Sequence, residues 1–140
     1  MAPAGGWVAI SGQIELPMIV LFLAVALWIA AFDAMYGAQD EAFDRSQGLH
    51  SLAVSFGAHG AFRIARAMHV ISILLFAVLG AMMHLAWPYA VGVVIAAATL
   101  IYQHRIAGPT DFSRVTQMYF MRNGIVSIAI FIFTWISYFV

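Results

Sequence analysis

The sequence predicts an all-helical integral membrane protein, and three observations support this fold class. Of the 140 residues, 64% are hydrophobic and only 9% are charged, whereas soluble domains carry about 25% charged residues. The mean hydropathy is +0.96. The apolar residues gather into four segments, three of which reach the roughly 20 residues that a membrane-spanning helix needs. We therefore expect residues 1–140 to form a single membrane unit of about four transmembrane helices.

Four spans are expected, and no linker divides the chain into separate units. The first covers about residues 16–36 and begins at Pro17, where the missing N–H of proline costs least. The second covers about residues 67–87. The third, about 88–102, is short for a span, and we expect it to be accommodated by tilt or by local thinning of the bilayer. The fourth covers about residues 117–140, so residues 40–66 and 103–116 are the expected polar loops.

The basic residues predict the orientation of the chain. All six are arginines, and none lies in the N-terminal tail, in the turn at 84–88 or at the C-terminus. They lie in or beside the two polar loops, at Arg45, Arg63, Arg66, Arg105, Arg114 and Arg122. Four spans place both loops on one side of the membrane, and the positive-inside rule makes that side cytoplasmic. The net charge of zero implies no nucleic-acid partner, and the absence of cysteine excludes disulfides and thiolate metal sites.

Three carboxylates follow the first span at a helical spacing. Asp33, Asp40 and Asp44 would fall within roughly 40° of one another on an unbroken helix. Like charges one turn apart repel, so this arrangement favours a bound cation. Hard cations take carboxylate oxygens and bridge them to substrate phosphates. The spacing alone leaves an alternative open, a solvated helix end whose acids pair with Arg45 or Arg66.

Two polar stretches carry long ordered motifs. The first has Asp33, Tyr36, Gln39, Asp40, Asp44, Gly48, Leu49, His50, Ser51, Phe56 and Gly57. The second has Tyr102, His104, Pro109, Asp111, Ser113, Arg114, Val115, Phe120, Asn123, Gly124 and Ser127. In order and spacing these positions resemble the UbiA family of intramembrane polyprenyltransferases, and the first stretch is similar to the second aspartate-rich motif of that family. The resemblance covers almost the whole chain.

The resemblance implies a transferase in a bacterial inner membrane. Such enzymes move a polyprenyl group from its diphosphate to an aromatic acid, typically 4-hydroxybenzoate in ubiquinone biosynthesis, and an acceptor of the menaquinone pathway is the alternative within this class. Carried over by position, Asp40 and Asp44 are the expected catalytic residues and ligands of Mg²⁺, at a site mouth that faces the cytoplasm. The expected substrate-binding residues are Asp33, Tyr36, Arg45, His50 and Ser51.

The sequence also departs from the family pattern. The first motif of the family, N-x-x-x-D-x-x-x-D, is absent, because the only asparagine is Asn123. The chain looks like the C-terminal half of a bundle of about nine helices, and we expect it to be inactive without the missing N-terminal half. The alternative is a non-catalytic membrane subunit or a cation-binding four-helix protein of the same fold. His69 and His84 have no partner at i+4 and are interpreted as core or interface histidines.

Overall fold

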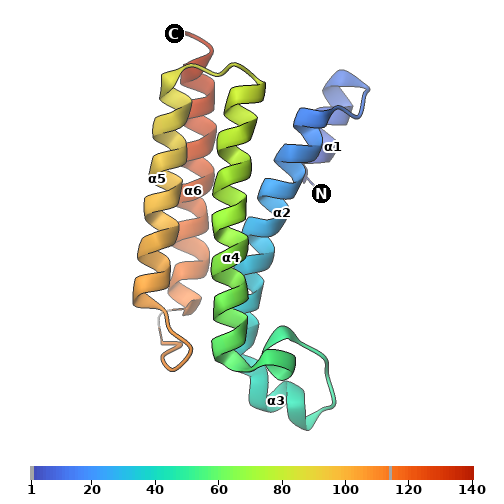
Figure 1. Ribbon diagram of the computed structural model, residues 1–140, viewed down its shortest axis with the longest axis vertical. Helices are drawn as coiled ribbons and strands as arrows, with labels where there is room; N and C mark the ends of the chain where they lie inside the picture. Colours follow the sequence, from blue (N-terminus) through green and yellow to red (C-terminus); the bar gives the residue numbers. More distant parts are fainter. Residues whose placement is uncertain (1, 114) are drawn as a thin grey trace.

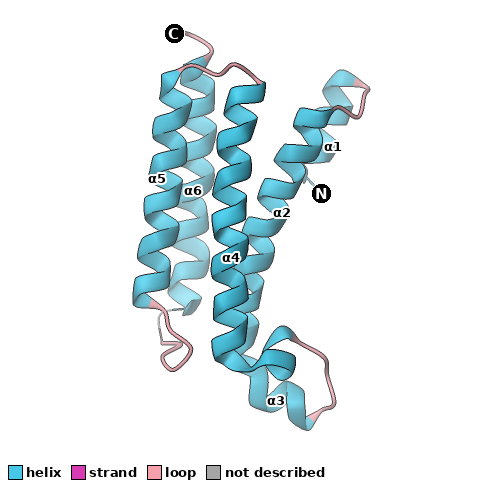
Figure 2. Cartoon of the chain, viewed as in Figure 1, coloured by secondary structure: helices cyan, strands magenta, loops and turns pink. Residues whose placement is uncertain are grey.

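The computed structural model describes residues 2–113 and 115–140, except for the side chains of residues 116–120. In this part of the chain every regular element is a helix (Figure 2), which confirms the predicted fold class. The elements are α1 (Ala2–Ser11), α2 (Leu16–Gly37), the 3₁₀ helix η1 (Ala38–Asp40), α3 (Glu41–Ser46), α4 (Leu52–Met82), α5 (Trp87–Ile106) and α6 (Val115–Ser137).

The long helices form two antiparallel pairs. Helix α2 packs along α4, and α5 packs along α6 (Figure 1). A smaller contact between α4 and α5 joins the two pairs. The segment that contains α3 and the loop between α5 and α6 lie at the same end of the bundle, opposite the turn between α4 and α5. We call the first end the loop end and the second the turn end.

Small residues bring α2 and α4 close together. Ala24 and Ala31 on α2 are fully buried, and side chains of this size let two membrane helices approach closely. The hydroxyl of Ser72 on α4 donates a hydrogen bond to the carbonyl of Ala24, at 2.7 Å. This bond satisfies a buried hydroxyl and links the two helices directly.

At the turn end, α4 and α5 pack together through a glycine on α4 and a tyrosine on α5. Tyr89 on α5 is buried, and its hydroxyl donates to the carbonyl of Phe76 on α4 at 2.8 Å. Its ring occupies the space where Gly80 has no side chain, because a Cβ built on Gly80 would lie 2.5 Å from Cε1 of Tyr89. Pro88 opens α5 in the first turn, where its missing N–H needs no partner.

Three described helical stretches are long and apolar enough to cross a membrane, namely Leu16–Ser46, Leu52–Met82 and Trp87–Ile106, and Met121–Ser137 is a shorter apolar helix. The chain is thus an all-helical membrane protein of about four helices. Two expected boundaries were wrong. Helix α4 begins at Leu52 and not near residue 67, and α5 has 20 residues, so the third span is not short.

The early start of α4 has a clear physical reason. Its first half contains exposed charges such as Arg63 and Arg66, which favoured a loop, but its buried residues recur every three or four positions, as expected of an amphipathic helix. These residues are Ala61, Phe62, Ala65, His69, Ser72 and Phe76. Helix α1 was not expected either, and it buries none of its residues.

Candidate functional site

The carboxylate motif lies on a short helix with a well-defined end. Helix α2 ends at Gly37, and the 3₁₀ helix η1 leads into α3 (Figure 1). At the other end of α3, the N–H of Leu49 donates to the carbonyl of Asp44 at 2.9 Å. Gly48 lies between them with φ = 67°, a left-handed conformation that glycine adopts without steric cost. The glycine therefore fixes where α3 stops.

Glu41 connects α3 to the kinked start of α4. One of its carboxylate oxygens pairs with Arg45 at 3.0 Å, and the other accepts the N–H of Ala58 at 3.0 Å. Ala58 follows Gly57, whose φ of 70° and ψ of 166° interrupt the α-helical geometry of α4. The N–H groups that follow such a break lack helical partners, and Glu41 supplies one. Arg45 also donates to the carbonyl of Val54 at 3.2 Å.

Asp40 and Asp44 are separated by one turn, with Asp40 at the N-cap of α3 and Asp44 in its first turn. Asp40 is exposed and Asp44 is half-buried. The unbroken helix that we assumed for Asp33, Asp40 and Asp44 is wrong, because η1 interrupts the α-helix between them. The described residues contain no group of three or more acidic or histidine side chains that could hold a metal ion.

A pair of carboxylates still fits Mg²⁺ in one setting. Magnesium is usually bound through one or two carboxylates, together with water and substrate phosphates. Within the described part of the chain, neither the side chain of Asp40 nor that of Asp44 forms an ion pair. No arginine that the structure describes therefore competes with a metal ion for either carboxylate, and their assignment as metal ligands stays a prediction.

The other expected substrate-binding residues border the same segment. Tyr36 lies in the last turn of α2 with 42% of its surface exposed. Ser51 is the N-cap of α4, and its hydroxyl accepts the N–H of Val54 at 3.2 Å. His50 is exposed beside it. Ser51 and Arg45 thus have structural partners within the segment, and their roles toward a substrate remain predictions.

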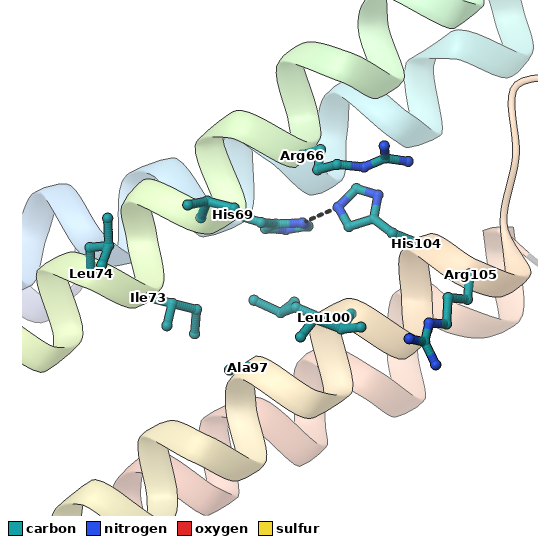
Figure 3. A pocket seen from close by; sticks show the side chains of 10 residues that line it. Arg66, His69, Ile73, Leu74, Ala97, Leu100, His104 and Arg105 are labelled. Atoms are coloured by element: carbon teal, nitrogen blue, oxygen red, sulfur yellow. Dashed lines mark hydrogen bonds between the residues drawn. The ribbon is translucent and has the colours of Figure 1, made fainter.

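Sequence reasoning missed two features. The first is the pairing of Glu41 with Arg45, for which the i,i+4 spacing was a visible signal. The second is the partner of His69, whose Nδ1 lies 2.8 Å from Nε2 of His104 on α5 (Figure 3). Spacing within one helix gave no sign of this pair, because the partner is on another helix. Arg114, used above to predict the orientation, lies outside the described residues.

Comparison with known proteins provides the family. The model of the UbiA prenyltransferase family matches residues 1–125. The chain belongs to this family. The match covers the segment with Asp40 and Asp44 and both polar loops, so the resemblance predicted from the two motifs is confirmed.

Three similar proteins are each named 4-hydroxybenzoate octaprenyltransferase. Those of Citrobacter koseri and Escherichia coli O9:H4 are each 28% identical over 144 residues, which cover 99% of this chain and 49% of theirs. That of Methylobacillus flagellatus is 30% identical over 124 residues, which cover 89% of this chain and 41% of its own length. The chain spans about half the length of the curated relatives it matches. No solved structure matches it.

Proposed function

We propose that this chain takes part in the transfer of a polyprenyl group from its diphosphate to an aromatic acceptor such as 4-hydroxybenzoate. The observation that carries the proposal is the pair Asp40 and Asp44, which lies at the loop end of the bundle inside the segment matched by the family model. The names of the relatives, which are octaprenyltransferases, support the reaction class.

Asp40 and Asp44 would hold Mg²⁺ together with the diphosphate of the substrate. Bound there, the ion would supply Lewis-acid stabilisation of the charge that develops on the leaving diphosphate. The chain itself positions the pair, because Glu41 and Arg45 fasten α3 to the start of α4. The apolar helices above α3 exclude water that would otherwise react with the electrophilic prenyl carbon.

Catalysis is proposed to require a second segment that carries the N-x-x-x-D-x-x-x-D motif. These 140 residues contain asparagine only at position 123, and ligand number and charge set the affinity of a site for a divalent cation. We therefore expect the chain to be inactive by itself. We also propose that the loop end, which carries most of the arginines, faces the cytoplasm in a bacterial inner membrane.

The test uses this chain reconstituted in liposomes with the N-terminal half of the Escherichia coli relative. Transfer from octaprenyl diphosphate to labelled 4-hydroxybenzoate is measured with and without Mg²⁺. Asp40→Asn and Asp44→Asn should each lower the rate by about a hundredfold or more, as expected when a group that stabilises developing charge is lost. Glu15→Gln is the matched control, because it removes a carboxylate before α2, at the other end of that helix, and its rate should stay within about twofold.

Three outcomes separate the possible functions. Rates close to wild type in both aspartate variants would remove the pair from the metal site. Transfer to a dihydroxynaphthoate in place of 4-hydroxybenzoate would assign an acceptor of the menaquinone pathway. Binding of Mg²⁺ by the reconstituted protein without transfer to either acceptor would favour a non-catalytic cation-binding membrane protein.

A further inference from the structure

Two hollows adjoin each other between α4 and α5 toward the loop end. The first, the apolar groove, has a volume of about 400 Å³. Its walls are mainly the aliphatic side chains of Val70, Ile73, Leu74, Ala97, Leu100 and Ile101. The second, the basic pocket, has a volume of about 420 Å³, and its polar lining includes His59, Arg63 and Asp111. Arg66, His104 and Arg105 line both hollows, so the two are continuous.

A pair of histidines, His69 (buried) and His104 (half-buried), lies where the two hollows meet. His69 has only 3% of its surface exposed, and its ring contacts that of His104 edge-on, with 5.0 Å between the centroids (Figure 3). The hydrogen bond between them uses one nitrogen of each ring. Nδ1 of His104 is buried without a hydrogen-bond partner, whereas His69 also contacts the backbone of Trp28 on α2. When Nδ1 of His69 donates to His104, the proton of the neutral His104 ring is on Nδ1 and needs an acceptor.

The charge around the pair is positive. Arg63, Arg66 and Arg105 are exposed, and none of them forms an ion pair with another described residue. The acid that lines the basic pocket, Asp111, accepts the N–H of Ser113 at 3.0 Å. Arginines at the ends of spanning helices lie at the depth of the lipid headgroups. The three guanidinium groups are thus available to an anion at the membrane surface.

We propose that the apolar groove and the basic pocket together bind an anionic membrane lipid. The lipid phosphate lies in the basic pocket, where Arg66 and Arg105 donate charge-assisted hydrogen bonds. One acyl chain lies along the apolar groove toward Ile73 and Leu74. Charge complementarity selects an anionic headgroup, and the aliphatic walls select an attached hydrocarbon chain. The site contains none of the residues proposed to bind Mg²⁺ or the prenyl diphosphate, although His104 and Asp111 belong to the second motif. The lipid proposal can therefore fail without the proposed function failing.

The purified chain in an uncharged detergent, titrated with phosphatidylglycerol, tests the proposal by native mass spectrometry. Arg66→Gln and Arg105→Gln should each weaken lipid binding about tenfold, the loss expected for a hydrogen bond to a charged group. Arg122→Gln is the matched control. Arg122 lies over the ring of Tyr102 at 4.4 Å and lines neither hollow. The affinity of the Arg122→Gln variant for phosphatidylglycerol should therefore change by less than about twofold.

Further ligands distinguish a lipid from a free anion. Phosphatidylcholine has the same acyl chains without net charge and should bind about tenfold more weakly. Inorganic phosphate lacks the acyl chains and should not compete at the same concentration. Equal binding of both lipids would overturn the charge argument, and competition by inorganic phosphate would assign the pocket to a soluble anion.

The lipid affinity of the Arg66→Gln and Arg105→Gln variants can exclude the site, provided that both variants fold. Arg66 and Arg105 are exposed, so the thermal unfolding of both glutamine variants should match that of the wild type. Wild-type lipid affinity in these folded variants would exclude the site. Loss of a dimer in the variants, with no dependence on phosphatidylglycerol, would assign this face to a second copy of the chain and would equally overturn the proposal.

Discussion

Helices α4 and α5 contact each other at two places that are built in different ways. At the turn end, the ring of Tyr89 lies against Gly80 and its hydroxyl bonds to the backbone of Phe76, so the helix surfaces meet directly. Toward the loop end, His69 and His104 reach across by one hydrogen bond, and the groove beside them stays open.

The difference shows how a membrane bundle can be tightly packed and receptive along the same pair of helices. Lipid is as apolar as leucine, so helices associate in a bilayer through close packing and hydrogen bonds and not through the hydrophobic effect. At the turn end the two helices pack closely around Gly80 and Tyr89, and a hollow of about 580 Å³ lies beside this contact. Toward the loop end, the hydrogen bond between His69 and His104 joins the helices. The groove beside this bond is lined in part by the long side chains of Arg66 and Arg105. The close packing at the turn end is thus expected to stabilise the helix pair, whereas the arginines that would bind an anionic ligand lie toward the loop end.

The largest effect is expected at the turn end. Gly80→Leu places a side chain where Cε1 and Cδ1 of Tyr89 lie 2.5 and 2.6 Å from the new Cβ. The tyrosine ring is held by its bond to Phe76 and cannot move without losing it. We expect a loss of about 3 kcal/mol in the free energy of unfolding, the upper part of the range for overpacked cores. Tryptophan fluorescence during unfolding by dodecyl sulfate in mixed micelles measures it.

Gly124→Ala is the control for this substitution. A Cβ on Gly124 meets nothing within 4 Å, and alanine in place of glycine within a helix stabilises it by up to about 1 kcal/mol. An unchanged or raised stability is therefore expected. If Gly80→Leu were tolerated as well as Gly124→Ala, the tight packing at the turn end would be refuted.

The same substitution, leucine to alanine, can be made at both ends of α4 to compare their packing. Leu79 is 6% exposed at the turn end, whereas Leu74 is 60% exposed in the apolar groove. Leu79→Ala should cost about 2 kcal/mol, near the low end for buried leucines, because in lipid only packing is lost. Leu74→Ala should cost less than about 0.5 kcal/mol in detergent. Similar losses in the same unfolding assay would mean that the groove is closed in solution.

The fold could be predicted where a continuous run of apolar residues is enough to specify a helix. A run of about 20 apolar residues in a bilayer forms a helix, because a helix pairs all of its backbone N–H and C=O groups within the segment. The first span was accordingly expected at residues 16–36, and helix α2 covers Leu16–Gly37. The start of α4 was not predicted. The charged residues on its exposed face indicated a loop, although its buried residues, from Ala61 and Phe62 onward, recur at a helical spacing.

The residues of the candidate site were proposed from a local motif, and their geometry could not be predicted from the sequence. Asp40 and Asp44 could be proposed because a motif is a local pattern, and the family match covers the segment that contains them. The break at η1 and the bond from Ala58 to Glu41 depend on backbone conformations and on contacts across 17 positions. His69 and His104 are 35 positions apart, and a single sequence does not say which helix faces meet.

A smaller effect than that of Gly80→Leu or Leu79→Ala is expected at the histidine pair, where it measures the hydrogen bond between the two rings. His69→Phe and His104→Phe should each cost about 1 kcal/mol, because each leaves a buried ring nitrogen without its partner. The double variant should cost little more than either single variant, which gives a coupling of about 1 kcal/mol for groups in direct contact. His59→Phe, an exposed histidine of the same helix, should stay within about 0.5 kcal/mol of the wild type. Strictly additive losses in the double variant would show that the rings do not bond to each other, and the open end of the contact would then need another explanation.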